Sequence, residues 1–118
     1  MAKLRVLIID DDPAYLTFCI AVLSDDYIVQ TSLSGSEALK TVTNFKPNII
    51  LLDIMMPIMD GIETCAKLRK MEVCLGSKII FASAIDDSEI KTACRDVGGD
   101  DFLCKPFEHE VLLNAIES

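Results

Sequence analysis

Five polar side chains of types that handle phosphoryl groups follow short apolar runs at distant points of the chain. They are Asp10, Asp11, Asp53, Ser83 and Lys105. Carboxylates offer the hard oxygen ligands that Mg²⁺ takes in proteins, and closely spaced carboxylates repel one another when no cation is bound. A lysine ammonium and a serine hydroxyl are suitable donors to phosphoryl oxygens. If the five converge, their chemistry suggests phosphoryl transfer to or from an aspartate.

The elements that must position these residues are short apolar runs alternating with helical patterns, which predict five β/α units. We expect strands at 4–9, 27–31, 49–52, 78–83 and 101–104, and helices at 13–24, 34–44, 62–71, about 86–97 and 107–117. Strands that are apolar on both faces favour an α/β fold with a doubly wound parallel sheet, because five units are too few to close an eight-unit barrel. Ligands bind such a sheet beyond the carboxyl ends of its strands, where all five polar residues fall.

Taken singly, these residues have simpler explanations. Asp12 before Pro13 is typical of a helix N-cap followed by the first helical position, so the run of aspartates can be a helix-terminal cluster. An aspartate that ends a strand is usually part of a turn, and a single lysine is usually a solvated charge. Only their joint placement at separate strand ends favours a functional site.

Composition excludes several classes of protein. The 118 residues suit one domain, and a hydrophobic content of 51% argues against disorder. The formal net charge of −8 disfavours direct binding to nucleic acid. The five cysteines lack metal-ligand spacing, so we expect buried thiols, Cys104 included. No signal peptide or membrane span is predicted, and we expect a cytoplasmic protein without membrane contacts.

Four segments carry a resemblance to a known family. VLIIDDDP, ILLDIMMPIMDG, IIFASA and DDFLCKPF, in this order and spacing, resemble the receiver domain of two-component response regulators. The resemblance covers essentially the whole chain and implies a flavodoxin-like sheet of strand order 2-1-3-4-5 with helices on both faces. It predicts one receiver domain over residues 1–118, with no output domain visible in the sequence.

The resemblance also implies roles for the site residues. Asp53 matches the phosphoacceptor, which would attack a phosphohistidine on a sensor histidine kinase or a histidine phosphotransfer protein. The direct ligands of a Mg²⁺ ion at this site would be Asp11, Asp53 and the carbonyl of Met55, and Asp10 would act through water. Lys105 would offset charge on the phosphoryl oxygens. Such a phosphoacceptor is not a turnover enzyme on a small substrate.

Two further positions match the switch of the family. Ser83 matches the hydroxyl that hydrogen-bonds the phosphoryl group, and Phe102 matches an aromatic residue that follows this hydroxyl. Their movement would remodel the surface formed by the fourth helix, the fifth strand and the fifth helix, which faces a downstream output domain or protein. The Lys105–Pro106 pair resembles a turn that the family forms with a cis bond.

The first predicted helix, 13–24, contains no charged side chain. A helix that is apolar all round is either fully buried or binds something, and an outer helix must expose one face. We therefore expect some of Tyr15, Phe18, Cys19 and Val22 to lie at the surface. In the resembled family this helix meets the histidine-bearing partner, which favours docking over self-association.

Three other functions fit less well. A phosphatase or phosphotransferase of the haloacid dehalogenase type wants a second carboxylate two residues after the nucleophile, where this chain has Met55. A flavodoxin-like carrier of FMN needs backbone and hydroxyl donors after the first strand, but Asp10, Asp11 and Asp12 would repel phosphate. A pseudo-receiver that only binds proteins is disfavoured because all five site residues are present.

Overall fold

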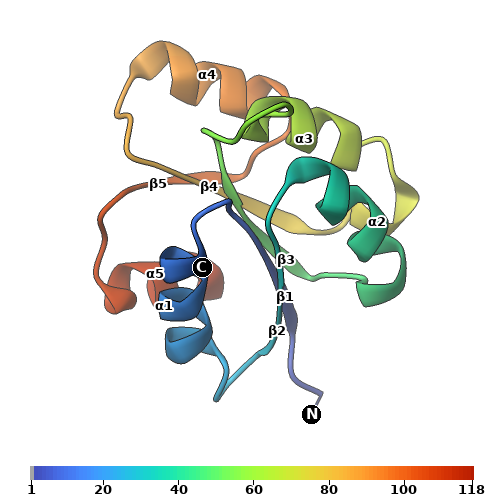
Figure 1. Cartoon of the computed structure of the whole chain (residues 1–118), viewed down its shortest axis with the longest axis vertical. Coiled ribbons are helices and arrows are strands. Elements are labelled where there is room, and N and C mark those ends of the chain that lie inside the picture. The colour runs from blue at the N-terminus through green and yellow to red at the C-terminus, as the bar shows by residue number, and fades with distance from the viewer. Residues whose placement is uncertain (1) are drawn as a thin grey trace.

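The computed structural model describes residues 2–118, which form a five-stranded sheet with strand order β2-β1-β3-β4-β5 (Figure 1). All four pairs of neighbouring strands are parallel. The strands are β1 (Arg5–Ile9), β2 (Ile28–Ser32), β3 (Ile49–Asp53), β4 (Lys78–Ser83) and β5 (Asp101–Cys104). The helices are α1 (Pro13–Leu23), α2 (Gly35–Phe45), α3 (Gly61–Leu68), the short 3₁₀ helix η1 (Glu72–Cys74), α4 (Ser88–Asp96) and α5 (His109–Glu117). The predicted fold class and strand order are confirmed.

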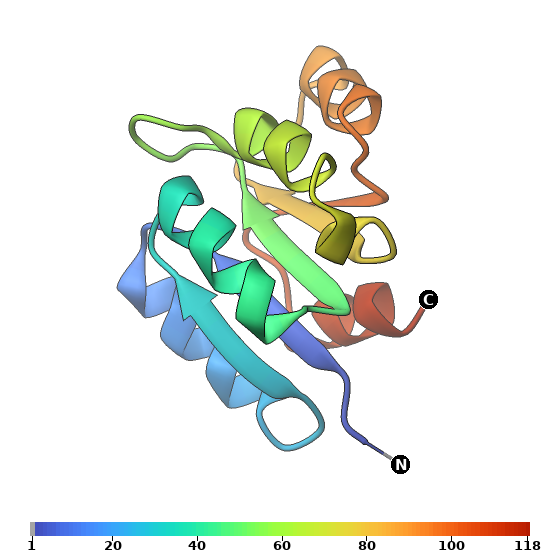
Figure 2. The same cartoon turned by 90° about the vertical axis from the view of Figure 1, so that its right-hand side faces the viewer.

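The helices cover both faces of the sheet, with α1 and α5 on one side and α2, α3 and α4 on the other (Figures 1 and 2). Successive side chains of β1 point to two different cores. Leu7 and Ile9 belong to the core under α2, α3 and α4, and Val6 and Ile8 belong to the core under α1 and α5. Because both faces are covered, every residue of β3 is buried. Each fully buried Leu or Ile contributes about 1.5 to 3 kcal/mol to folding.

Polar caps fix where the helices begin. The side chains of Asp12, Ser34, Asp60 and Asp87 each accept a hydrogen bond from a backbone N–H in the first turn of α1, α2, α3 and α4. The predicted N-cap at Asp12 and the proline at the first helical position are therefore confirmed. Two of these caps, Asp12 and Asp60, stand beside the loops that follow β1 and β3.

Every predicted helix differs from the structure by one to three residues at one end or both, and the third and the last show the physical reason. The third helix ends at Leu68, short of residue 71, and the chain then forms η1. Here the Arg69 guanidinium donates to the carbonyl oxygens of Cys74 and Ser77, which holds the chain in a turn. The last helix begins at His109 because Glu108, in extended conformation, occupies the N-cap position. Strands β4 and β5 have the predicted bounds.

The cysteines depart from the expectation at one position. Four are buried, but Cys104 is exposed, so the prediction of a buried thiol there is wrong. The reason is topological: β5 is an edge strand, and its first and last residues are exposed while Leu103 is buried. Lys105–Pro106 is a cis peptide bond, as the sequence resemblance implied. Within residues 2–118, no helix has the length and apolar character needed to span a membrane.

Candidate functional site

The site lies at the carboxyl ends of the central strands. Asp10 follows β1, Asp53 ends β3, Ser83 ends β4 and Lys105 follows β5. Strands β1 and β3 are neighbours, yet the chain continues from them to opposite sides of the sheet, so the space above them is the topological switch point of the fold. Parallel pairing brings residues far apart in sequence to this one edge, as expected.

Three carboxylates converge there. Ligand oxygens of Asp10, Asp11 and Asp53 all lie within 4.8 Å of one another. Asp10 and Asp53 are buried, while Asp11 is exposed. Carboxylate oxygens at this spacing fit Mg²⁺, which takes a few protein oxygens and keeps several waters. The carbonyl of Met55 stays a predicted ligand, and the Met55 side chain is exposed at the start of the next loop.

Lys105 completes the charge arrangement. Its Nζ donates to Oδ2 of Asp10 at 2.6 Å and to Oδ1 of Asp53 at 3.4 Å. The other carboxylate oxygen of Asp10 accepts from the backbone N–H of Asp12 at 2.9 Å. Both carboxylate oxygens of Asp10 thus already accept a hydrogen bond. This is consistent with the prediction that Asp10 would bind a cation through a water molecule. Asp53 keeps more of its hydrogen-bonding capacity for an incoming group.

The electrostatics of Asp53 set it apart from an ordinary aspartate. Burial and, after it, the negative charge of Asp10 raise the pKa of Asp53 to about 6, although the Lys105 ammonium acts in the opposite direction. When no cation is present, the ionised form of Asp53 therefore lowers the free energy of unfolding at neutral pH. A divalent cation at the three carboxylates would relieve that cost.

Ser83 is fully buried at the end of β4. Its Oγ accepts a hydrogen bond from the backbone N–H of Ile85 at 3.1 Å, so the hydroxyl is tied to the loop that leads into α4. If the Ser83 hydroxyl formed a different hydrogen bond, the loop that leads into α4 would therefore lose this restraint.

The loop between β3 and α3 holds Asp53 in place through a residue that sequence reasoning did not single out. The backbone N–H of Gly61 donates to the carbonyl of Ile54 at 2.8 Å. A Cβ atom at position 61 would lie 2.0 Å from the carbonyl oxygen of Asp53. Only glycine permits this approach of α3 to the strand end. The Asp-Gly pair after the MMPIM segment is the sequence signal that could have indicated it.

Tyr15 also has a place at the site. Its ring centroid lies 3.9 Å from Nζ of Lys105, and its edge-to-face partner is Phe107. The sequence predicted Tyr15 as a surface residue of a docking helix and gave no sign of this contact.

The family described as "Response regulator receiver domain" matches residues 6–117 of this chain. The chain belongs to the response regulator receiver domains. The response regulator MprA of Mycobacterium sp. (strain KMS) is 39% identical over 110 residues, 92% of this receiver domain. The chain spans about half the length of that protein, 47%.

Two other proteins are similar over nearly the whole receiver domain. Protein PilG of Pseudomonas aeruginosa is 36% identical over 116 residues, which are 98% of this chain and 86% of PilG. The solved structure of the chemotaxis protein CheY4 of Vibrio cholerae has a TM-score of 0.95 and 29% sequence identity, and 98% of each chain is covered.

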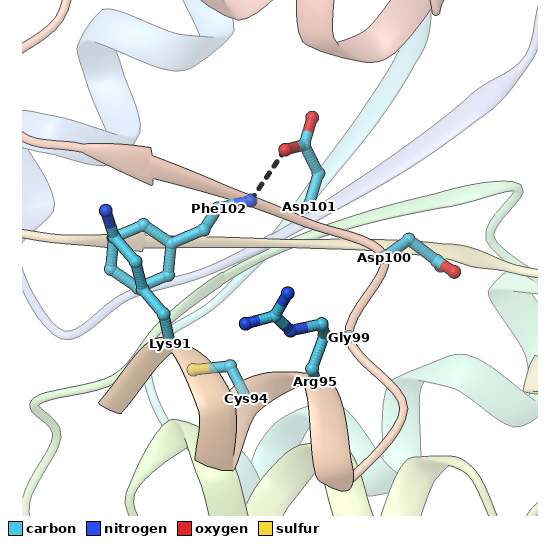
Figure 3. Close-up of a pocket in the computed structure, with 7 residues that line it drawn as sticks. All are labelled: Lys91, Cys94, Arg95, Gly99, Asp100, Asp101 and Phe102. Carbon is cyan, nitrogen blue, oxygen red and sulfur yellow. Dashed lines mark hydrogen bonds between the residues drawn. The ribbon is translucent and has the colours of Figure 1, made fainter. Parts of the chain in front are cut away.

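Phe102, which the sequence resemblance predicts as the aromatic switch residue, lies at the surface between α4 and β5 of the receiver domain. Phe102 is half-buried, and Nζ of Lys91 lies 5.3 Å from its ring centroid (Figure 3). Lys91 also pairs with Asp86 at 2.6 Å, in the loop that follows Ser83. Figure 3 shows that Cys94 and Arg95 line the same pocket from the α4 side. The aromatic ring and the Ser83 loop are thus connected through Lys91.

The surface exposure predicted for the first helix is found at some of its positions and not at others. Phe18 is 39% exposed, and Tyr15 and Val22 are partly buried. Cys19 is fully buried, so its prediction as a docking residue is wrong. With Leu16 and Leu23, Cys19 forms the stripe of α1 that packs on the sheet. Ile20, which the prediction omitted, is 41% exposed.

A largely apolar pocket of about 410 Å³ lies beside this helix and reaches the site. It is lined by Tyr15, Phe18, Ala84, Lys105, Pro106 and Phe107. The exposed part of α1 and the site of the receiver domain therefore form one continuous surface.

Proposed function

We propose that this receiver domain is a phosphoacceptor in two-component or phosphorelay signalling, with Asp53 as the acceptor. The phosphoryl group would come from a phosphohistidine of a sensor histidine kinase or a histidine phosphotransfer protein. The domain acts once per phosphoryl group received, and is not a turnover enzyme on a small substrate. The observation that carries the proposal is the cluster of Asp10, Asp11 and Asp53 within 4.8 Å, with Lys105 bonded to two of them.

The chemistry follows from this arrangement. A carboxylate oxygen of Asp53 attacks the phosphorus atom in line with the phosphorus–nitrogen bond, which breaks and leaves its electron pair on the imidazole nitrogen. Lys105 donates to a phosphoryl oxygen, and its charge stabilises the developing negative charge. Asp11 and Asp53, with Asp10 beside them, would hold Mg²⁺, and the cation would supply further positive charge at the phosphoryl oxygens.

Output is proposed to pass through the surface of α4, β5 and α5. A phosphoryl group on Asp53 attracts the Ser83 hydroxyl, which now accepts from Ile85 at the entrance to the loop before α4. That loop carries Asp86, the partner of Lys91, which lies over Phe102. A shift of the loop therefore changes the restraint on Phe102 and biases the surface offered to a downstream domain or protein.

The incoming partner is proposed to dock on α1 and the adjoining apolar pocket. Phe18 is exposed there, and the pocket reaches Lys105. A partner helix with an apolar face would cover Phe18 and place its phosphohistidine over the carboxylates.

The test of the proposed function is intact mass after incubation with acetyl phosphate, with Mg²⁺ or with EDTA. We expect the mass of one phosphoryl group to be gained only with Mg²⁺. Reduction with borohydride converts an aspartyl phosphate to homoserine, and peptide mapping should find it at position 53. If no adduct forms under conditions that label a control receiver domain, the chain is a pseudo-receiver that binds proteins without regulation by phosphorylation.

The lifetime of the phosphoryl group gives a separate prediction. The side chain of Met55 is 62% exposed two residues after the acceptor and has no group that can act as a base toward water. We expect slow self-dephosphorylation, and faster loss in Met55→Asn because the amide can orient an attacking water. Loss of phosphate after removal of the donor measures both rates. Equal lifetimes would show that backbone geometry, and not this side chain, sets the rate.

A further inference from the structure

The Lys105 ammonium has three neighbours, and one of them is an aromatic ring. Its Nζ lies 2.6 Å from Asp10 Oδ2, 3.4 Å from Asp53 Oδ1 and 3.9 Å from the ring centroid of Tyr15. An ammonium has three N–H donors, and two are directed at the carboxylates. The ring face occupies the remaining side at a distance typical of a cation–π interaction.

The ring is held in place independently of Lys105. Phe107, which precedes α5, packs against Tyr15 edge-to-face, with ring centroids 6.1 Å apart and planes at 85°. The Tyr15 hydroxyl is buried and has no hydrogen-bond partner among residues 2–118. Burial, and then the neighbouring Cys19, raise the pKa of Tyr15 far above its ordinary value, so the phenol is neutral. The ring face, and not the hydroxyl, is therefore the part of Tyr15 that acts on the ammonium.

We propose that Tyr15 is a positioning residue for phosphoryl transfer, whose ring holds Lys105 Nζ at the Asp10–Asp53 pair and excludes water from its third side. This inference rests on the proposed function of Asp53. A lysine side chain has several rotatable bonds, so a fixed contact on the ammonium reduces the number of positions it samples. A less hydrated ammonium also interacts more strongly with phosphoryl oxygens.

The position of Tyr15 gives this contact a second consequence. Tyr15 belongs to α1 and lines the same apolar pocket as Phe18. A partner that docks on α1 therefore touches the ring that orients Lys105. The residue that receives the partner and the residue that meets the phosphoryl group are in direct contact.

The kinetic test compares Tyr15→Leu, which removes the ring, with Tyr15→Phe, which keeps it. At saturating Mg²⁺, the limiting rate of phosphorylation by acetyl phosphate should fall about tenfold in Tyr15→Leu and change by less than about twofold in Tyr15→Phe. Tyr27→Leu is the control, because Tyr27 packs against the same core and directly precedes Ile28, which pairs with Arg5 at the end of β1 opposite to the site. If Tyr15→Leu does not fold, Tyr15→Met replaces the ring with an unbranched apolar side chain that adapts to the space left. A ringless variant that reacts at the natural rate would overturn the inference.

A spectroscopic readout separates this role from simple packing. Lys105 Cε is bonded to Nζ, which lies 3.9 Å from the ring centroid, so the NMR resonance of its protons should be shifted upfield by the ring current. The shift should persist in Tyr15→Phe and disappear in the ringless variant, and an unshifted resonance in the natural chain would contradict the contact itself. This readout needs no phosphoryl transfer. If the natural chain accepts no phosphoryl group but the resonance is shifted, the proposed function fails while the contact stands.

Discussion

Asp53→Asn is expected to abolish phosphoryl uptake and, at the same time, to make the fold more stable. The amide cannot attack phosphorus, so the acetyl phosphate adduct should disappear. Burial and the negative charge of Asp10 together raise the pKa of the Asp53 carboxyl to about 6, against the opposing effect of Lys105. Holding that carboxylate ionised costs the folded chain on the order of 2 to 3 kcal/mol at neutral pH without a divalent cation. Asparagine removes this cost and leaves Lys105 paired with Asp10 at 2.6 Å.

The pH dependence of this difference has a definite sign. The pKa of Asp53 is higher in the folded chain than in the unfolded chain, so the folded state binds the proton more tightly. The natural chain should therefore gain stability relative to Asp53→Asn as the pH falls from about 6 to about 4. Above pH about 6 the full difference is expected, and below the unfolded pKa of about 3.9 it vanishes.

Urea unfolding in EDTA across this pH range measures the effect. Asp25→Asn is a matched control, because Asp25 is an exposed aspartate away from the site. The control should unfold as the natural chain does. If Asp53→Asn and the natural chain had the same free energy of unfolding at neutral pH, ionisation of Asp53 would not destabilise the folded chain. Added Mg²⁺ should stabilise the natural chain more than the variant, since Asp53 is a proposed ligand.

The sheet and the acidic edge could be predicted because they rest on local signals. The short apolar segments before Asp10 and Asp53 favour buried strands in a covered sheet, and parallel pairing, in the strand order that the family resemblance implies, places both aspartates at one edge. Ser83 and Lys105 follow for the same reason. No knowledge of side-chain direction is needed for these residues, since each one directly ends or follows a strand.

The details missed by sequence reasoning depend on which way a side chain points. Helix α1 is apolar all round, so its sequence has no contrast between a buried and an exposed face, and Cys19 could not be told from Ile20. The contact of Tyr15 with Lys105 joins residues from α1 and the end of β5, and no local pattern encodes it. Cys104 is exposed because β5 is an edge strand, which is a property of the strand order.

The second large effect is expected at Gly61, where the fold and the site share one constraint. A Cβ atom there would lie 2.0 Å from the carbonyl oxygen of Asp53 and 2.8 Å from Cα of Ile54. Both obstacles are backbone atoms, which cannot rotate away as a side chain can. Gly61→Ala must therefore push α3 from the end of β3, at a cost of about 1 to 3 kcal/mol or more.

Gly76→Ala is the matched control, because nothing lies within 4 Å of a Cβ atom at that position. Urea unfolding should show a large loss of stability for Gly61→Ala and little change for Gly76→Ala. Phosphorylation by acetyl phosphate should also fall in Gly61→Ala, since the displaced backbone is that of the acceptor itself. Stability and phosphoryl uptake thus decline together at Gly61, whereas they move in opposite directions in Asp53→Asn. An unfolding midpoint for Gly61→Ala equal to that of the control would show that the loop yields freely and does not fix Asp53.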